Sequence, residues 1–231
     1  MGATSIPNLY VEGKDDVSVI NALLFRHGLD TQKGTRHLHI KEQESVENLL
    51  ANMPVAIKAA TSSPVGFAID IDIEITNRWN AVRGRLSEFD IAIPTDCPVD
   101  GFLGQVPGYP HEFGVWLMPD CRSDGQRLED LVQSLIPASH PLWSHAQAST
   151  RAAAGLVDEA NALLPNHARK WKRFGDGVRI KAEVRSWLAW QHKPGVQLGA
   201  AINDQILGHD SPQARAFLRW IMRLYPLALA V

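Results

Sequence analysis

The first half of the chain alternates short apolar runs with segments whose apolar residues recur at helical spacing. Residues 8–11, 65–73 and 114–118 are apolar runs of the length typical of strands, and residues 37–40 form a shorter one. Strands that alternate with amphipathic helices are typical of a mainly parallel sheet covered by helices on both faces. The sequence therefore predicts an α/β fold.

Helical spacing predicts helices between these strands. One begins at Asp15 or Asp16 and ends at Gly28, where a glycine suits the C-terminus of a helix. A second begins at Val46, and Pro54 is expected to interrupt it because proline lacks a backbone donor. Two more are predicted, one over residues 79–89 and one beginning at Asp124.

The pattern divides the chain into two parts. Residues 90–113 are rich in Pro, Gly and Asp and are predicted to form a long irregular connection. After Pro141 only helical patterns occur, over residues 142–164, 180–191 and 212–225, the last with Ser211 as its cap. We expect a Toprim-like α/β core over residues 1–140, on the resemblance given below. A helical C-terminal part over residues 141–231 is expected to pack on it as one compact unit.

Composition narrows the class of protein. Of the 231 residues, 45% are hydrophobic and 21% are charged, which is ordinary for a globular domain. No apolar run approaches the roughly 20 residues of a membrane helix, and the first residues lack a secretory pattern, so a cytoplasmic protein is expected. Cys97 and Cys121 have no metal-type spacing and are expected to be free thiols. The net charge of −2 gives no support for binding nucleic acid by overall charge alone.

Acidic residues lie where two predicted strands end. Asp70 and Asp72 are two positions apart, so on a strand both side chains would point to the same face. Glu12 ends the first strand, and side chains at the carboxyl ends of neighbouring parallel strands meet at one edge of the sheet. Paired carboxylates repel each other unless a cation lies between them, and Mg²⁺ or Mn²⁺ suits oxygen ligands. These residues therefore predict a metal site able to act on phosphate esters.

Two segments resemble the motifs of the Toprim superfamily, which occurs in topoisomerases, primases and the OLD-type nucleases. Residues 10–16 (YVEGKDD) resemble the first motif and residues 66–72 (GFAIDID) the second. Residues 113–132 and 181–202 resemble a family of uncharacterised bacterial proteins grouped with the OLD-type proteins. This resemblance extends over most of the chain, from about Asn8 to Tyr225.

The resemblance implies roles for individual residues. Glu12 would be a metal ligand or general acid/base, and Lys181 would supply positive charge for catalysis. The implied metal ligands are Glu12, Asp16, Asp70, Asp72 and Glu129. A helix cap explains Asp16 equally well, and a solvated helix edge is the alternative for Glu129. The chain has no G-x-x-x-x-G-K-[ST] motif, so any ATP-driven role would need a separate ATPase partner.

A basic tract is a second candidate for binding nucleic acid. Residues 169–185 hold seven basic and two acidic residues, with Trp171 and Phe174 interleaved. Basic residues for phosphates and rings for bases are typical of single-strand binding. The alternative is a basic helix edge whose rings pack on the core. The predicted contacts to nucleic acid are Arg169, Lys170, Lys172 and Arg173.

Three functions remain open on the sequence. The first is Mg²⁺-dependent phosphoryl transfer on nucleic acid by a Toprim/OLD-like nuclease, for which the resemblance implies a phage-defence context. The second is a non-catalytic interaction or regulatory subunit that works with a separate ATPase. The third is a phosphatase of the haloacid-dehalogenase type, whose Asp motif follows the first strand. Here a complete strand–helix unit precedes Asp70, which disfavours the third.

Overall fold

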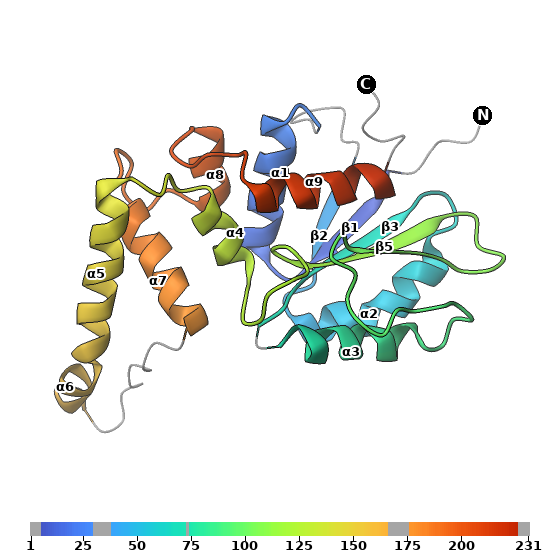
Figure 1. Ribbon diagram of the computed structural model, residues 1–231, viewed down its shortest axis with the longest axis horizontal. Helices are drawn as coiled ribbons and strands as arrows, with labels where there is room; N and C mark the ends of the chain where they lie inside the picture. The colour runs from blue at the N-terminus through green and yellow to red at the C-terminus, as the bar shows by residue number, and fades with distance from the viewer. Residues whose placement is uncertain (1–5, 30–37, 73, 166–175, 226–231) are drawn as a thin grey trace.

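The computed structural model describes residues 6–29, 38–72, 74–165 and 176–225. Their centre is a sheet with the strand order β2-β1-β3-β5-β4 (Figure 1). Neighbouring strands are parallel except for β4, which runs antiparallel to β5 at one edge. The strands are β1 (Asn8–Val11), β2 (His39–Glu42), β3 (Val65–Asp70), β4 (Phe102–Gln105) and β5 (Glu112–Met118). The expected α/β class with a mainly parallel sheet is confirmed.

Helices cover both faces of this sheet. Figure 1 shows α1 and α9 on one face and α2 and α3 on the other. The helices are α1 (Lys14–Arg26), α2 (Val46–Ala59), α3 (Ile75–Leu86), α4 (Leu128–Ser134), α5 (Pro141–Gly155), α6 (Val157–Ala162), α7 (Asp176–Ala189), α8 (Leu198–Asn203) and α9 (Pro212–Leu224). Because both faces are covered, the first five residues of β3 are all buried. None of the described helices combines the length and apolar character that a membrane crossing requires.

The last helix packs directly on the sheet. Ser211 accepts a hydrogen bond from the N–H of Ala214 and caps α9, as predicted. Glycines let α9 approach the strands closely: a Cβ on Gly114 would lie 2.7 Å from Leu224 Cδ2 and 2.9 Å from Trp220 Cζ2. The C-terminal end of the described chain therefore contributes to the central core.

The other helices after Pro141 take different positions. Helix α8 packs on α1 so closely that a Cβ on Gly199 would lie 2.3 Å from the carbonyl oxygen of Ser18. Helices α5, α6 and α7 lie to one side of the sheet in Figure 1, where α7 contacts both α5 and α4. The contact between α7 and α4 matters for function because it brings α7 beside the site described below.

Two sequence expectations are wrong, and one helix was missed. Pro54 does not interrupt α2, because a face that includes Leu49, Met53 and Ile57 is buried and stabilises the helix across the proline. Residues 90–113 are not wholly irregular, since β4 lies within them and pairs with β5. Helix α8 has only six residues and was not predicted, because so short a segment shows little periodicity.

Two further differences concern segment ends near the site. Helix α4 starts at Leu128 and not at Asp124. The carboxylate of Asp124 instead accepts a hydrogen bond of 2.7 Å from the N–H of Ile75, the first residue of α3. Strand β3 ends at Asp70, three residues earlier than predicted. The next two N–H groups, of Ile71 and Asp72, both donate to the carbonyl of Gln126 at 3.1 Å instead of continuing the sheet.

Candidate functional site

A cavity of about 580 Å³ opens at the carboxyl ends of β1, β2 and β3. Its position matches the edge at which ligands bind in open α/β sheets. The acidic residues of its lining are Glu12, Asp15, Asp16, Glu42, Glu44, Asp70 and Glu129, and the basic ones are Lys14, Arg127 and Lys181. Seven acidic side chains against three basic ones give the cavity a strongly negative lining.

Glu12 and Asp70 meet because β1 and β3 are neighbours. The two strands pair in parallel with Tyr10 opposite Phe67, so both end at the same edge. Glu12 follows β1 directly, and its Oε1 accepts a hydrogen bond of 2.8 Å from the N–H of Asp70. The predicted convergence of these two residues at one edge of a parallel sheet is confirmed.

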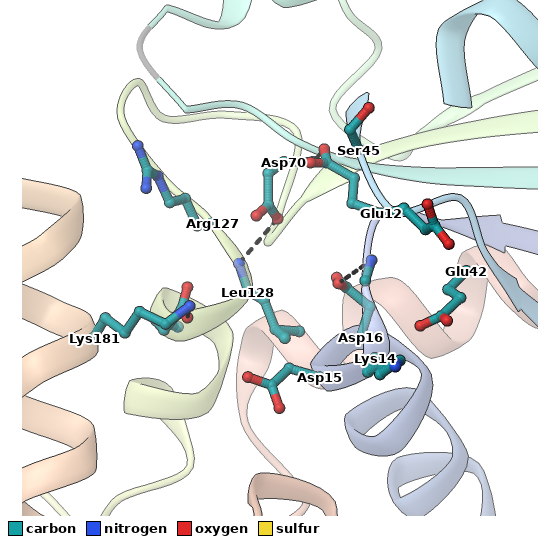
Figure 2. A pocket seen from close by; sticks show the side chains of 13 residues that line it. Glu12, Lys14, Asp15, Asp16, Glu42, Ser45, Asp70, Arg127, Leu128 and Lys181 are labelled. Carbon is teal, nitrogen blue, oxygen red and sulfur yellow. Dashed lines mark hydrogen bonds and ion pairs between the residues drawn. The ribbon is translucent and has the colours of Figure 1, made fainter. Parts of the chain in front are cut away.

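The start of α4 holds the Asp70 carboxylate by a hydrogen bond. Its Oδ1 accepts a hydrogen bond of 3.0 Å from the N–H of Leu128, the first residue of that helix (Figure 2). The next residue, Glu129, is 6% exposed and also lines the cavity. The start of α4 therefore supplies both a donor to Asp70 and another carboxylate.

Asp16 belongs to the first turn of α1 and faces the same cavity. Its Oδ2 accepts a hydrogen bond of 3.0 Å from the N–H of Gly13, which satisfies a donor at the start of the helix (Figure 2). The side chain is 7% exposed. Gly13, not Asp15 or Asp16, is thus the N-cap of α1, and Asp16 serves as the third helical residue of a capping box. Asp16 both supports the start of the helix and belongs to the acidic cluster, so the two readings of its role are compatible.

Helix α7 brings two cations to the acidic residues. Lys181 Nζ lies 2.9 Å from Glu129 Oε1, and Figure 2 shows its side chain reaching from α7 towards the start of α4. One helical turn later, Arg185 Nη2 lies 2.5 Å from Asp15 Oδ2. Residues four apart share one helix face, so a single face of α7 neutralises part of the cluster.

Electrostatics show how unfavourable the cluster is without a bound cation. Burial, followed by repulsion from Glu12 and Glu129, raises the pKa of Asp16 to about 7. Burial also raises the pKa of Asp70 well above its usual value, and Asp16, Glu12 and Glu129 raise it further. The pKa of Glu12 is raised chiefly by burial, although the hydrogen bond from Asp70 opposes the shift. The negative charges of Glu12, Asp16 and Asp70 are therefore destabilised by their surroundings.

The lining fits a hard divalent ion in its chemistry. Its donors are carboxylate oxygens, which Mg²⁺ prefers, and positive charge would relieve the repulsion between them. Within the described residues, no three or more His, Cys, Asp or Glu side chains are already grouped to hold a metal ion. Mg²⁺ commonly uses only one or two carboxylates, with water and substrate phosphate as its other ligands. An ion bound by Glu12 or Asp70 with such ligands is consistent with this arrangement.

Asp72 does not share a strand face with Asp70, so the geometric reason given for pairing them is wrong. Strand β3 ends at Asp70, and Asp72 adopts a left-handed backbone with φ of 66°. Its carboxylate contacts Arg78 and Arg127 and is not among the residues that line the cavity. The metal-binding role implied for Asp72 stays a prediction.

Some predicted site residues fall outside the described residues, and some residues that line the cavity were not predicted. The tract of Arg169, Lys170, Lys172 and Arg173 lies outside the described residues. Glu42 ends β2 and Glu44 follows it; both were missed, although their place just after the predicted strand over residues 37–40 was a usable signal. Arg127 and Arg185 were missed because single arginines on helix starts and faces carry no sequence signal for a site.

Comparison with known proteins places the chain in one family without indicating an activity. Residues 7–226 match a family described as "Protein of unknown function (DUF3226)". No curated protein and no solved structure matches the chain. Function is therefore inferred from the geometry of the site.

Proposed function

We propose that this chain, which belongs to the family described as "Protein of unknown function (DUF3226)", catalyses Mg²⁺-dependent phosphoryl transfer on nucleic acid as a Toprim-type nuclease. The observation that carries the proposal is the convergence of Glu12, Asp16, Asp70 and Glu129 on one cavity, where burial and mutual repulsion raise the pKa of the first three. Buried carboxylates that destabilise one another at a sheet edge are typical of functional sites rather than of structural ones.

The residues of the cavity have complementary tasks in phosphodiester hydrolysis. A bound Mg²⁺ or Mn²⁺ ion would supply positive charge to the phosphate oxygens and help to ionise a water. Glu12 and Asp70 are the side chains placed to hold the ion, and Glu12 is also able to accept a proton from the attacking water. Lys181 stabilises the negative charge that builds up on the phosphate. The water oxygen bonds to phosphorus, and the bond to one ester oxygen breaks as that oxygen takes up a proton.

The Toprim assignment rests on where the two motif-like segments lie. The acidic residue of the first segment follows β1, and that of the second ends the neighbouring β3. A Toprim/OLD-like nuclease acting in phage defence in the cytoplasm is the function we assign to this arrangement. A separate ATPase is the partner that such a role would use, because the sequence has no nucleotide-binding motif of the P-loop type.

A non-catalytic subunit is the second candidate, and two observations favour it. The described residues hold no ready-made group of three metal ligands, and the net charge of −2 offers no general attraction for nucleic acid. In this alternative the cavity binds an ion or a basic partner segment without chemistry. The cavity chemistry is the same in both candidates, so only an activity assay separates them.

The test is cleavage by the purified full chain. Single- and double-stranded DNA and RNA are incubated with the protein and Mg²⁺ or Mn²⁺, with a chelator as the negative control. We expect metal-dependent cleavage that Asp70→Asn abolishes and Asp204→Asn leaves unchanged, since Asp204 pairs with Lys193 and lies outside the cavity lining. No cleavage by the wild type, alone or with an ATPase partner, would support the non-catalytic subunit instead.

A further inference from the structure

The Asp72 carboxylate is occupied by two arginines. Arg78 Nη2 lies 2.6 Å from Asp72 Oδ2, and Arg127 Nε lies 3.0 Å from Asp72 Oδ1. Both oxygens therefore contact a guanidinium, and the side chain of Arg78 is only 14% exposed. A carboxylate held by two cations has little remaining attraction for a third.

Asp72 also lies within a series of contacts that joins the end of β3 to the start of α4. Beside the Asp72–Arg127 ion pair, the N–H groups of Ile71 and Asp72 donate to Gln126. Leu128 in turn donates to Asp70. Each of residues 126–128 thus makes a hydrogen bond or an ion pair with a residue of the segment 70–72. Glu129, which lines the cavity, is the next residue in the chain.

We propose that Asp72 is a positioning residue that fixes residues 126–129 through Arg127 and Arg78, and that it does not ligate the metal ion. The inference rests on the proposed function, in which Asp70 and Glu129 form the site that this segment completes. Asp72 holds the Leu128 N–H on Asp70 and keeps Glu129 within reach of Lys181. The two aspartates of the Asp-x-Asp sequence thus have different roles. Asp70 faces the cavity, whereas Asp72 faces the arginines that hold residues 126–129 in place.

The two roles predict opposite effects on the metal-free protein. A ligand carboxylate repels its neighbours when no ion is bound, so its neutralisation stabilises the fold. A carboxylate clamped by two arginines stabilises the fold, so its neutralisation leaves two guanidinium groups without their partner. Asp72 also repels Glu12 and Asp70, so the unfolding experiment measures whether its direct contacts of 2.6 and 3.0 Å with the arginines outweigh this repulsion.

The experiment compares Asp72→Asn, Asp70→Asn and Asp204→Asn by urea unfolding in the presence of a chelator. We expect Asp72→Asn to lower the unfolding midpoint by about 0.5 M or more. Asp70→Asn should leave the midpoint unchanged or raise it, and Asp204→Asn should leave it unchanged. An increase for Asp72→Asn would overturn the proposal.

Amide hydrogen exchange separates positioning from a general structural effect. In Asp72→Asn we expect peptides that cover residues 126–129 to exchange about fivefold faster, while peptides from β1 and α9 keep their wild-type rates. Calorimetric titration with Mn²⁺ should give an affinity within about threefold of wild type for Asp72→Asn and a loss of at least about tenfold for Asp70→Asn. Unchanged exchange at residues 126–129, or a loss of Mn²⁺ affinity as large as that of Asp70→Asn, would overturn the positioning role.

A milder variant covers the case in which Asp72→Asn does not fold. Arg78→Lys keeps the charge but loses the guanidinium geometry, and it should also lower the midpoint and speed exchange at residues 126–129. Wild-type values for both would refute the clamp. If the wild type binds no Mn²⁺ at all, the proposed function fails, whereas the unfolding and exchange results still decide whether Asp72 fixes the segment.

Discussion

Lys181 Nζ lies 2.9 Å from Glu129 Oε1, and this ion pair joins α7 to the acidic cavity. The two partners differ in exposure: the Lys181 side chain is 56% exposed, whereas that of Glu129 is 8% exposed. The exposed Lys181 side chain has room to move, whereas the buried Glu129 does not. In the proposed function, Lys181 would turn from Glu129 to a phosphate bound in the cavity.

Lys181→Ala should lower nuclease activity by about 10²-fold, because a cation that meets the charge developing on phosphate is worth this much in comparable sites. The fold should be retained, but stability should fall, because the buried Glu129 carboxylate loses its cation. Mn²⁺ affinity should be retained or rise, because the cavity becomes more negative. Lys193→Ala is the matched control: its ion pair with Asp204 lies outside the cavity lining. Equal rates for Lys181→Ala and the control would remove Lys181 from the mechanism.

The metal-free protein should lose stability as the pH rises from about 4 to about 7. The pKa of Asp16 is raised in the folded state from 3.8 to about 7, so the folded state holds this proton more tightly than the unfolded state. Stability then falls with increasing pH across that window, by on the order of 3 kcal/mol for this one group. Glu12 and Asp70 act in the same direction because their pKa values are also raised.

Asp16→Asn should reduce this pH dependence while keeping an acceptor for the Gly13 N–H. Urea unfolding at several pH values with a chelator present measures the change, and Asp204→Asn serves as the control. Saturating Mg²⁺ should also flatten the wild-type profile, since the ion favours the ionised carboxylates. A stability that rises with pH in the metal-free wild type across this window would contradict the assigned electrostatics.

Gly114→Ala should destabilise the protein by about 1–3 kcal/mol, because the new methyl group would lie 2.7 Å from Leu224 and 2.9 Å from Trp220. The effect tests whether α9 packs on the sheet as described. Gly84→Ala is the control, for which we expect the opposite change in stability. Gly84 lies in α3, where a Cβ would have no atom within 4 Å apart from the helix's own nearby backbone. That change should stabilise the helix by about 0.5–1 kcal/mol. Thermal unfolding of both variants measures the difference.

The sequence predicted the parts of the fold that depend on strong local patterns. Residues 8–11 form β1 as predicted, and Ser211 caps α9 as predicted. Segment ends set by distant contacts were not predictable. Strand β3 stops at Asp70 because the N–H groups of the next two residues donate to the carbonyl of Gln126. Asp124 accepts a hydrogen bond from the first residue of α3 and does not begin α4.

The same distinction applies to the site. Glu12 follows β1 and Asp70 ends the neighbouring β3, so their meeting could be inferred from the expectation that the two strands are parallel neighbours. The orientation of Asp72 could not, because it depends on a left-handed backbone and on Arg127, which is 55 positions away in the chain. Arg185 escaped prediction for a similar reason, since its partner Asp15 belongs to a different part of the sequence.

In the proposed function, the carboxylates of Glu12 and Asp70 hold a divalent ion in the acidic cavity. Anomalous diffraction from crystals soaked in Mn²⁺ tests it most directly, because the signal locates the metal and its ligands together. We predict a peak in the cavity with a carboxylate oxygen of Asp70 or Glu12 at coordination distance, and its loss in crystals of Asp70→Asn. A Mn²⁺ peak elsewhere, or an empty cavity at millimolar Mn²⁺ concentration, would contradict the account.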